Sequence, residues 1–437
     1  MPEQPQKNTL QTEIEKLNQK VESLHSLLDI SAIINSELDL NQLLEISMHL
    51  AKKVMQAEAA SLMLFNEDKS ELHFKIALGD VGAQLLNGVT VPLKNSIAGS
   101  VATSGRSVII QDAQNDNRFH RETDKRTGFI TKTVLCAPLK TRTDIIGVTQ
   151  VLNRTTNKPF ENEDLALFEA FSSQVATAIE NARLHTSLLD KQRLEQELET
   201  AAIIQKGFLP QAFPENKKFD IAACHISAKQ CSGDFYDIIE YENNQMGILI
   251  GDVAGKGVPA ALHMAGFISD FRSLAPVKRD TAQLFNSLNQ MLFKKMLQGK
   301  FITITYIMVD YSTYIVELLN AGHIPSIHIN GKSGEMKRID AKGGPPLGIS
   351  NLIKYEYEST RFEEGDTFLM FTDGLTEAMS PGGEMYGYET LEEILKKNCH
   401  RPLSEIVDAI VADVRTFAGD GEPHDDLTLI AFKLKEL

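Results

Sequence analysis

The chain has 437 residues, enough for two domains of ordinary size, and its hydrophobic fraction of 42% suits packed cores. A net charge of -15 argues against nucleic acid as a partner, because a phosphate backbone attracts basic surfaces. No apolar run approaches the roughly 20 residues that span a bilayer, and the N-terminus lacks a secretory pattern. We therefore expect a cytoplasmic protein with no membrane partner. The four cysteines form no CxxC pair, which argues against a disulfide framework or a thiolate zinc site.

Residues 1–30 carry apolar side chains at alternating spacings of four and three, which is the a/d pattern of a coiled coil. These side chains belong to Leu10, Ile14, Leu17, Val21, Leu24 and Leu28. Because the pattern is short, two interpretations stay open. The segment is either a parallel two-helix coiled coil or one amphipathic helix packed on its own domain.

Residues 31–183 alternate helical and strand patterns, which favours an α/β sensor domain with one sheet. A helical run, LLEISMHLAKKVMQ, comes first. The strand-like runs that follow are ASLMLFN, LHFKIAL, SVIIQD, TVLCAPLK and IIGVTQVLN. A long amphipathic run, DLALFEAFSSQVATAIENARL, closes the domain.

Residues 184–212 form a polar helical stretch without glycine or proline before Gly207. Apolar side chains recur along it at Leu184, Leu188, Leu194, Leu198, Ala201 and Ile204. We predict a helical linker, which would connect two domains more stiffly than a Gly/Ser-rich segment. Its apolar stripe, together with that of residues 1–30, predicts a parallel homodimer, because pairing removes both stripes from water.

Residues 213–437 are rich in short strand-like runs separated by helical runs. The strand-like runs are IAACHIS, MGILIGD, FITITYIMVD, YIVELLNAG, DTFLMFTD and LTLIAFKL. This pattern predicts an α+β domain with antiparallel sheets.

Acidic residues of this last domain lie in or at the ends of hydrophobic strands, beside turns. They are Asp234 in CSGDFYD, Asp252 after GILIG, Asp373 after FLMFT, and Asp425 and Asp426 before LTLIAFKL. A single aspartate in such a place is usually a turn former. Four such places are harder to explain that way, because strand ends in a sandwich converge and would bring the carboxylates together.

Clustered carboxylates repel one another unless a cation lies between them. Oxygen ligands without histidine or cysteine select hard cations such as Mg²⁺ or Mn²⁺. Two such ions can clamp a phosphoryl oxygen and turn a bridging water into a hydroxide nucleophile at neutral pH. Asp234 and Asp237 are three apart, so on a strand they point to opposite faces. Asp425 and Asp426 diverge likewise, and we expect one residue of each pair in the cluster.

Ordered motifs over residues 198–434 resemble those of SpoIIE-like phosphatases of the PPM superfamily. The motifs are GDFYD, GDVAGKG, NAGHIPSIHI, GGPPLGI, FTDGLTEA and DDLTLI. The resemblance implies an α+β PPM fold, an antiparallel β-sandwich flanked by helices. It also implies that two Mn²⁺ or Mg²⁺ ions are bound by Asp234, Asp252, Asp373 and Asp425, with the backbone carbonyl of Val253.

The same resemblance implies a metal-dependent protein serine/threonine phosphatase that acts on a regulatory phosphoprotein. In the family this substrate is often an anti-sigma-factor antagonist with a STAS domain. The alternative is a small-molecule receptor, for example for a cyclic nucleotide, whose phosphatase-like domain is a docking module. The filled acidic positions favour the enzyme. We expect His323 to be a turn or core residue, and Lys256 either to approach a substrate phosphate or to form a solvated turn.

The N-terminal half resembles a GAF domain over DAQNDNRFHRETDKRTGFITKTVLCAPL and IIGVTQVLN. It is similar to the GAF domains of cyclic-nucleotide phosphodiesterases, which often carry an Asn-Lys…Phe…Asp-Glu signature. The matching residues are Asn153, Arg154, Phe160 and Asp164, with Leu165 in place of the glutamate. The resemblance implies a GAF sensor that regulates the phosphatase. Its ligand is a cyclic nucleotide, another small molecule, or none.

Overall fold

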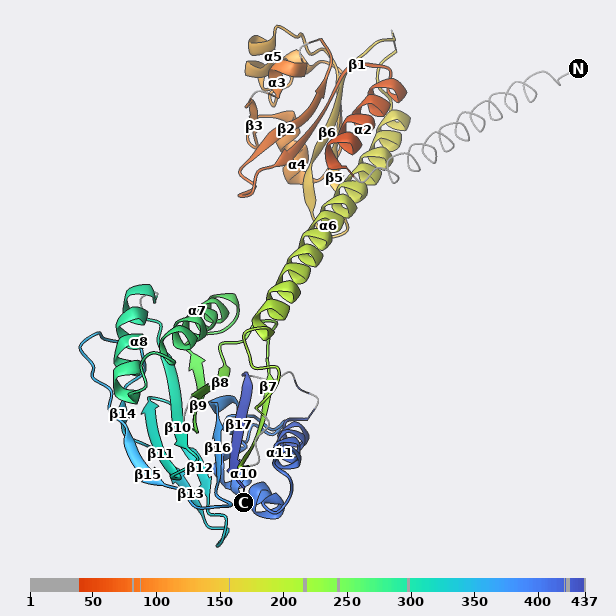
Figure 1. Ribbon diagram of the computed structural model, residues 1–437. Helices are drawn as coiled ribbons and strands as arrows, with labels where there is room; N and C mark the ends of the chain where they lie inside the picture. The colour runs from red at the N-terminus through yellow and green to blue at the C-terminus, as the bar shows by residue number, and fades with distance from the viewer. Residues whose placement is uncertain are drawn as a thin grey trace, which may run out of the picture. The chain divides into compact units, whose positions relative to one another are not determined.

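The computed structural model describes residues 39–80, 82–86, 88–156, 158–214, 218–241, 244–296, 299–419, 421 and 425–435 (Figure 1). The predicted heptads of residues 10–28 lie outside this part of the chain. Two compact units divide the chain at Met1–Gln192 and Arg193–Leu437. Within the described residues, no helix combines the length and apolar character that a membrane span requires.

The first unit is built on one antiparallel sheet with the strand order β3-β2-β1-β6-β5-β4. Its strands are β1 (Ala57–Phe65), β2 (Glu71–Leu78), β3 (Thr90–Pro92), β4 (Val108–Ile110), β5 (Val134–Lys140) and β6 (Ile145–Arg154). One face packs against α2 (Leu40–Val54) and the first part of α6 (Asn162–Lys206). The other face carries α3 (Gly82–Leu85) and α4 (Ile97–Ser104), with the turn η1 (Ala113–Asn115) and α5 (Arg121–Thr127) beside them.

Local sequence explains where these helices begin and end. The carboxylate of Asp39 accepts hydrogen bonds from backbone amides in the first turn of α2. The hydroxyl of Ser96 does the same for Gly99 at the start of α4, and Gly105 ends that helix at a left-handed φ of 65°. All predicted strands of this unit form. Only the three-residue β3 was not predicted, because its sequence, TVP, ends in a proline, which is unfavourable in a strand pattern.

The second unit is a sandwich of two sheets, one ordered β14-β11-β10-β9-β8 with β15 beside β11, the other β13-β12-β16-β17-β7. The longer strands are β7 (Phe219–Ile226), β8 (Phe235–Tyr241), β9 (Gln245–Val253), β10 (Ile302–Asp310), β11 (Ile315–Ala321), β16 (Thr367–Phe371) and β17 (Leu427–Leu434). The shorter ones are β12 (Ser326–Ile329), β13 (Met336–Ile339), β14 (Gly343–Gly344) and β15 (Glu358–Arg361). Every pairing is antiparallel except that of β11 with β14.

Helices cover both outer faces of this sandwich (Figure 1). The first sheet packs against α7 (Val258–Leu274) and α8 (Thr281–Lys295), the second against α10 (Gly387–Asn398) and α11 (Leu403–Ala418). Along β16, Phe368 and Met370 enter the inner core, whereas Leu369 and Phe371 face α10 and α11. This alternation is the period of two expected of a strand buried on both faces. The predicted α/β unit followed by an α+β sandwich is confirmed.

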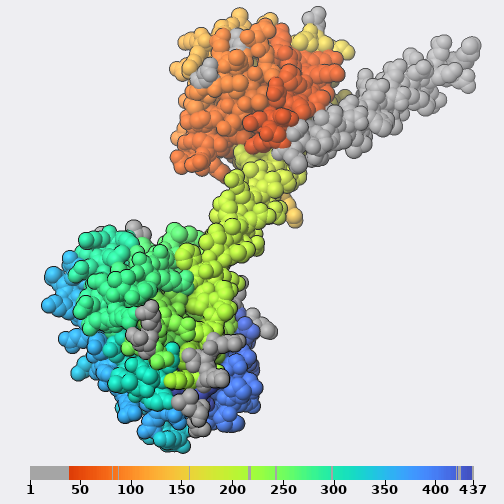
Figure 2. Space-filling model, viewed as in Figure 1, coloured from red at the N-terminus to blue at the C-terminus, as the bar shows by residue number. Residues whose placement is uncertain are grey.

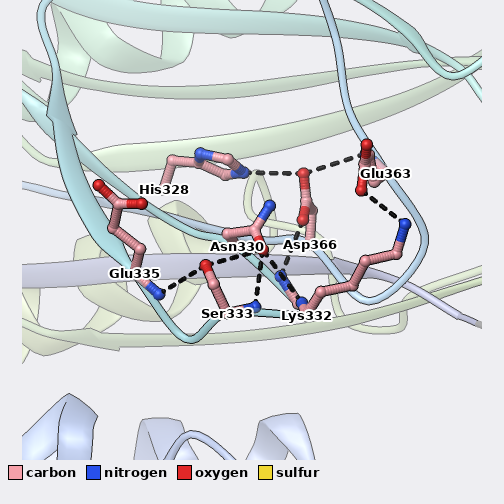
Figure 3. Close-up of polar contacts among 8 residues, drawn as sticks. His328, Asn330, Lys332, Ser333, Glu335, Glu363 and Asp366 are labelled. Atoms are coloured by element: carbon pink, nitrogen blue, oxygen red, sulfur yellow. Dashed lines mark hydrogen bonds and ion pairs between the residues drawn. The ribbon is translucent and has the colours of Figure 1, made fainter.

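A polar network fixes the turn between β12 and β13 (Figure 3). The buried carboxylate of Asp366 accepts hydrogen bonds from the amides of Gly331 at 2.8 Å and Glu363 at 3.0 Å. It also lies 2.9 Å from Nε2 of His328. Asn330 accepts from two backbone amides of the same turn. Because these groups satisfy one another, we assign the network a structural role.

Residues 184–206 of the predicted helical linker belong to α6, which runs for 45 residues and ends at Lys206, whereas residues 207–212 are not helical. Much of α6, in yellow-green, lies at the surface (Figure 2). Several of its apolar side chains are exposed. They belong to Leu184, Leu188, Leu189, Leu194, Ile203 and Ile204.

Candidate functional site

The four predicted aspartates come from strand ends of both sheets. Asp234 directly precedes β8 and Asp252 lies near the end of β9, in one sheet. Asp373 follows β16 and Asp425 precedes β17, in the other. Thr372 joins the two groups, because its Oγ1 donates a hydrogen bond of 2.6 Å to Oδ2 of Asp234. The sandwich therefore brings residues almost 200 positions apart into one acidic cluster.

Burial and mutual repulsion favour the protonated forms of three of these carboxyl groups, those of Asp234, Asp252 and Asp373. Burial, followed by the charges of Asp373 and Asp425, raises the pKa of Asp252 to about 7. Burial, followed by the charge of Asp252, raises the pKa of Asp234 well above its usual value. Burial and the charge of Asp425 also raise the pKa of Asp373. The cluster is thus a place where bound positive charge would be stabilised.

Lys256, in the loop after β9, is the cation paired with Asp425. Its Nζ lies 2.9 Å from Oδ2 of Asp425, and this hydrogen bond raises the pKa of the lysine. In the arrangement seen across the described residues, no three carboxylate, imidazole or thiol groups are already spaced to hold one cation.

Gly233 leaves a small polar space beside the cluster. A Cβ atom at this position would lie 2.9 Å from the carbonyl oxygen of Val253 and 3.0 Å from Oδ1 of Asp252. It would also lie 3.3 Å from the carbonyl oxygen of Gly255. Three oxygen atoms thus border a space that any larger residue would fill. Such an oxygen-only donor set suits hard divalent cations, so the residues present fit Mn²⁺ or Mg²⁺.

Asp426 and Asp237 lie close to cluster residues in the sequence but bind other groups. Asp426 accepts hydrogen bonds from the amides of Ala228 at 2.7 Å and Gly233 at 3.1 Å, so it holds the loop that precedes β8. Asp237 accepts two hydrogen bonds of 2.8 Å from Arg272 of α7. One aspartate of each closely spaced pair therefore lies in the cluster, and the other binds groups outside it.

Comparisons with known proteins show the family of this chain. The family model described as stage II sporulation protein E (SpoIIE) matches residues 242–435, and the GAF domain model matches residues 39–179. Phosphoserine phosphatase RsbU of Bacillus subtilis (strain 168) is 30% identical over 245 residues, which cover 56% of this chain and 72% of RsbU. The chain belongs to the SpoIIE-type phosphatase family.

Two further proteins are similar to this SpoIIE-type chain. Protein IcfG of Synechocystis is 28% identical over 262 residues, which cover 54% of this chain and 41% of IcfG. The PP2C domain of SiaA from Pseudomonas aeruginosa has a TM-score of 0.50 at 23% identity, covering 56% of this chain and 99% of that domain. The SiaA domain shares the fold. The predicted fold class, a GAF domain followed by a PPM-type phosphatase fold, is confirmed.

His323 of the SpoIIE-type unit links the two sheets next to the cluster. Its Nδ1 lies 2.9 Å from Oγ1 of Thr303, which pairs with Asp252 across β9 and β10. Its Nε2 lies 3.0 Å from the carbonyl oxygen of Phe371, two residues before Asp373. Burial lowers the pKa of His323 to about 4, so the ring is neutral at pH 7. The predicted core role agrees with this placement.

Gln205, near the end of α6, is a supporting residue that sequence reasoning missed. Its buried amide group donates to the carbonyl oxygen of Ser232 at 2.5 Å and accepts from the amide of Ser232 at 3.0 Å. The hydroxyl of Ser232 accepts from the amide of Asp234 at 3.0 Å. The sequence signal for this contact is weak, because a glutamine in a polar helix is usually solvated.

The predicted GAF ligand residues lie together where β6 leads into α6. Arg154 forms an ion pair with Asp164, and its guanidinium lies 5.3 Å from the ring centre of Phe160. Asn153 donates to Glu58 and accepts from two backbone amides. An apolar cavity lies between the sheet of this domain and α3, α4 and α5, and none of the four predicted residues lines it. The contacts of Arg154 hold the end of β6 against the start of α6. A ligand in that cavity would not touch the four residues.

Proposed function

We propose that this SpoIIE-type chain is a divalent-cation-dependent protein phosphatase that hydrolyses phosphoserine or phosphothreonine. The observation that carries the proposal is the convergence of Asp234, Asp252, Asp373 and Asp425 from both sheets, with raised pKa values where burial and repulsion are strongest. The name of RsbU, a phosphoserine phosphatase that this chain covers over 72% of its length, supports the choice of substrate.

The four aspartates and the carbonyl group of Val253 would hold two Mn²⁺ or Mg²⁺ ions. Ions bound there would supply Lewis acidity and a hydroxide nucleophile at neutral pH. Other residues of the chain would orient these ligands and the substrate. Thr372 orients Asp234, and Lys256, next to Asp425, provides a point charge suited to the phosphate of a substrate.

The proposed substrate is a phosphorylated regulatory protein. The resemblance to the family favours a STAS-domain anti-sigma-factor antagonist. The GAF domain is proposed to regulate the phosphatase through α6, because this helix begins in the first unit and its residue Gln205 contacts the loop that carries Asp234.

Hydrolysis of p-nitrophenyl phosphate in the presence of Mn²⁺ tests the proposal. Asp252→Asn and Asp373→Asn should each abolish turnover while circular dichroism reports an intact fold. The control is Asp220→Asn, which changes an exposed aspartate paired with Lys435 in the same unit and should leave turnover unchanged. Near-wild-type turnover by Asp252→Asn or Asp373→Asn would show that the substituted residue is not a cation ligand.

A further inference from the structure

A second lysine, Lys300, lies beside the loop that follows Asp252, in the segment that leads into β10. The pairing of β10 with β9 brings it there. Beyond the last pair of that ladder, the amide of Ala254 donates a hydrogen bond of 2.9 Å to the carbonyl oxygen of Phe301. Lys300 therefore comes next to Gly255, three residues after Asp252.

Gly255 leaves room for the ammonium group of Lys300. A Cβ atom at Gly255 would collide with Nζ of Lys300, so any larger residue there would force the ammonium group away. The carbonyl oxygen of the same glycine is one of the three oxygen atoms that border the space beside Gly233. From this approach and the bond lengths of the backbone, Nζ lies within about 7 Å of that oxygen atom. The ammonium group is thus at the edge of the oxygen-lined space.

Lys300 differs from Lys256 in having no carboxylate partner. Lys256 is paired with Asp425. Among the residues that the structure describes, none forms an ion pair or a hydrogen bond with the half-buried side chain of Lys300. An ammonium group held in this way has its N–H donors available for an anion that enters the site.

The chemistry of the substrate calls for such a donor. The phosphate group of a phosphoserine carries about two negative charges near pH 7, and the carboxylates of the cluster repel it. A lysine ammonium group supplies a point charge with three N–H donors, a form of phosphate binding that is common in proteins. Lys300 offers this charge next to the cluster without belonging to the acidic set itself.

We propose that Lys300 binds a phosphate oxygen of the phosphoserine substrate and thereby sets the affinity of the site for phosphorylated substrates. The inference rests on the proposed function and adds a substrate-binding residue to it. Lys300 lies outside the family motifs, between GDVAGKG and NAGHIPSIHI, so those motifs do not mark it.

Steady-state hydrolysis of a phosphoserine peptide by the full chain in Mn²⁺ tests this inference. Lys300→Met keeps an unbranched side chain but removes the charge. It should raise KM and the inhibition constant of inorganic phosphate about tenfold, the value of one hydrogen bond to a charged group, with kcat within about twofold of the wild type. The matched control is Lys332→Met. It removes an exposed lysine paired with Glu363, before the start of β16, whereas Asp373 follows the end of that strand. All three constants of this control should stay at the wild-type values.

Two further measurements separate a substrate contact from a structural role. Because the ammonium group of Lys300 has no partner among the described residues, Lys300→Met should melt at the wild-type temperature. Its Mn²⁺ concentration for half-maximal turnover should not rise. A lower melting temperature or a higher Mn²⁺ requirement would overturn the inference.

The inference is also wrong if an active wild type and Lys300→Met share the same KM and the same inhibition by phosphate, or if only kcat falls. Either result would leave the proposed function intact. A wild type without turnover would contradict the proposed function, and this inference with it.

Discussion

Asp425 and Asp426 are adjacent in the sequence but have different surroundings, so the same substitution should have different effects. Asp425→Asn removes a proposed cation ligand and should lower Mn²⁺-dependent turnover by more than about 100-fold, the upper range for changes outside the ligand set. The stability of this variant should change little, because the partly exposed ion pair of Asp425 with Lys256 contributes about 0–1 kcal/mol.

Asp426→Asn should show the opposite balance. The amide keeps one acceptor oxygen, so one of the contacts to Ala228 and Gly233 is lost inside the protein. We expect the free energy of unfolding to fall by about 1–3 kcal/mol, with measurable turnover retained. Turnover and urea unfolding of the same preparations check both variants. If Asp426→Asn lost more activity than Asp425→Asn, the cation ligand would be Asp426 and not Asp425.

His323 predicts a pH dependence of stability. Burial lowers its pKa in the folded state to about 4, from an ordinary value of 6.5. Below pH 6.5 the unfolded chain binds a proton at this histidine that the folded chain does not, so the contribution of His323 to stability falls as the pH decreases from 6.5 towards 4. The loss should approach about 3 kcal/mol.

The comparison that isolates this contribution is urea unfolding at pH 7 and pH 5. His323→Gln has no titrating group, so it should be less stable than the wild type at pH 7 but lose less on acidification. His400→Gln changes an exposed histidine and should keep the wild-type pH dependence. An unaltered pH dependence in His323→Gln would assign the effect to other groups.

Among the secondary-structure elements, α6 contacts the loop that carries Asp234 through the side chain of Gln205. Gln205→Leu keeps the helix and a similar volume but leaves the amide and carbonyl groups of Ser232 unpaired. We expect the Mn²⁺ concentration for half-maximal turnover to rise about 10–100-fold. Gln196→Leu, at an exposed position of the same helix, is the control. If Gln205→Leu behaves like this control, α6 is only a spacer next to the site.

The elements that could be predicted are those whose local pattern is strong. The long strands β9, β10, β16 and β17 carry mainly apolar runs, and the aspartates beside β9, β16 and β17 lie where strand ends meet. The strands β12 to β15 have only two to four residues, so no periodicity can develop.

The supporting contacts of the cluster could not be predicted, because they depend on tertiary structure. Gln205 and Ser232 are 27 residues apart, and Thr372 and Asp234 are 138 apart. The role of the GAF signature could not be decided from the sequence for a related reason. Arg154 and Asp164 have the chemistry of a ligand site, but the same ion pair serves equally to hold a helix against a strand.

At the scale of the whole molecule, the surface of α6 predicts self-association. Leu184, Leu188, Leu194 and Ile204 are between 53% and 63% exposed, although such side chains are usually buried. A second copy packed in parallel along α6 would cover them. Light scattering at micromolar concentration should give twice the chain mass of 48.5 kDa. Leu188→Glu combined with Leu194→Glu should give a monomer, and a monomeric wild type would rule out this pairing.

The central claim is that the acidic cluster uses divalent cations to hydrolyse a phosphoserine ester. Release of inorganic phosphate from a phosphoserine peptide, measured against Mn²⁺ concentration for the wild type and Asp373→Asn, tests it most directly. The account predicts saturable release by the wild type, none after removal of the cation by a chelator, and none by Asp373→Asn. Release that persists in the chelator, or equal release by Asp373→Asn, would contradict it.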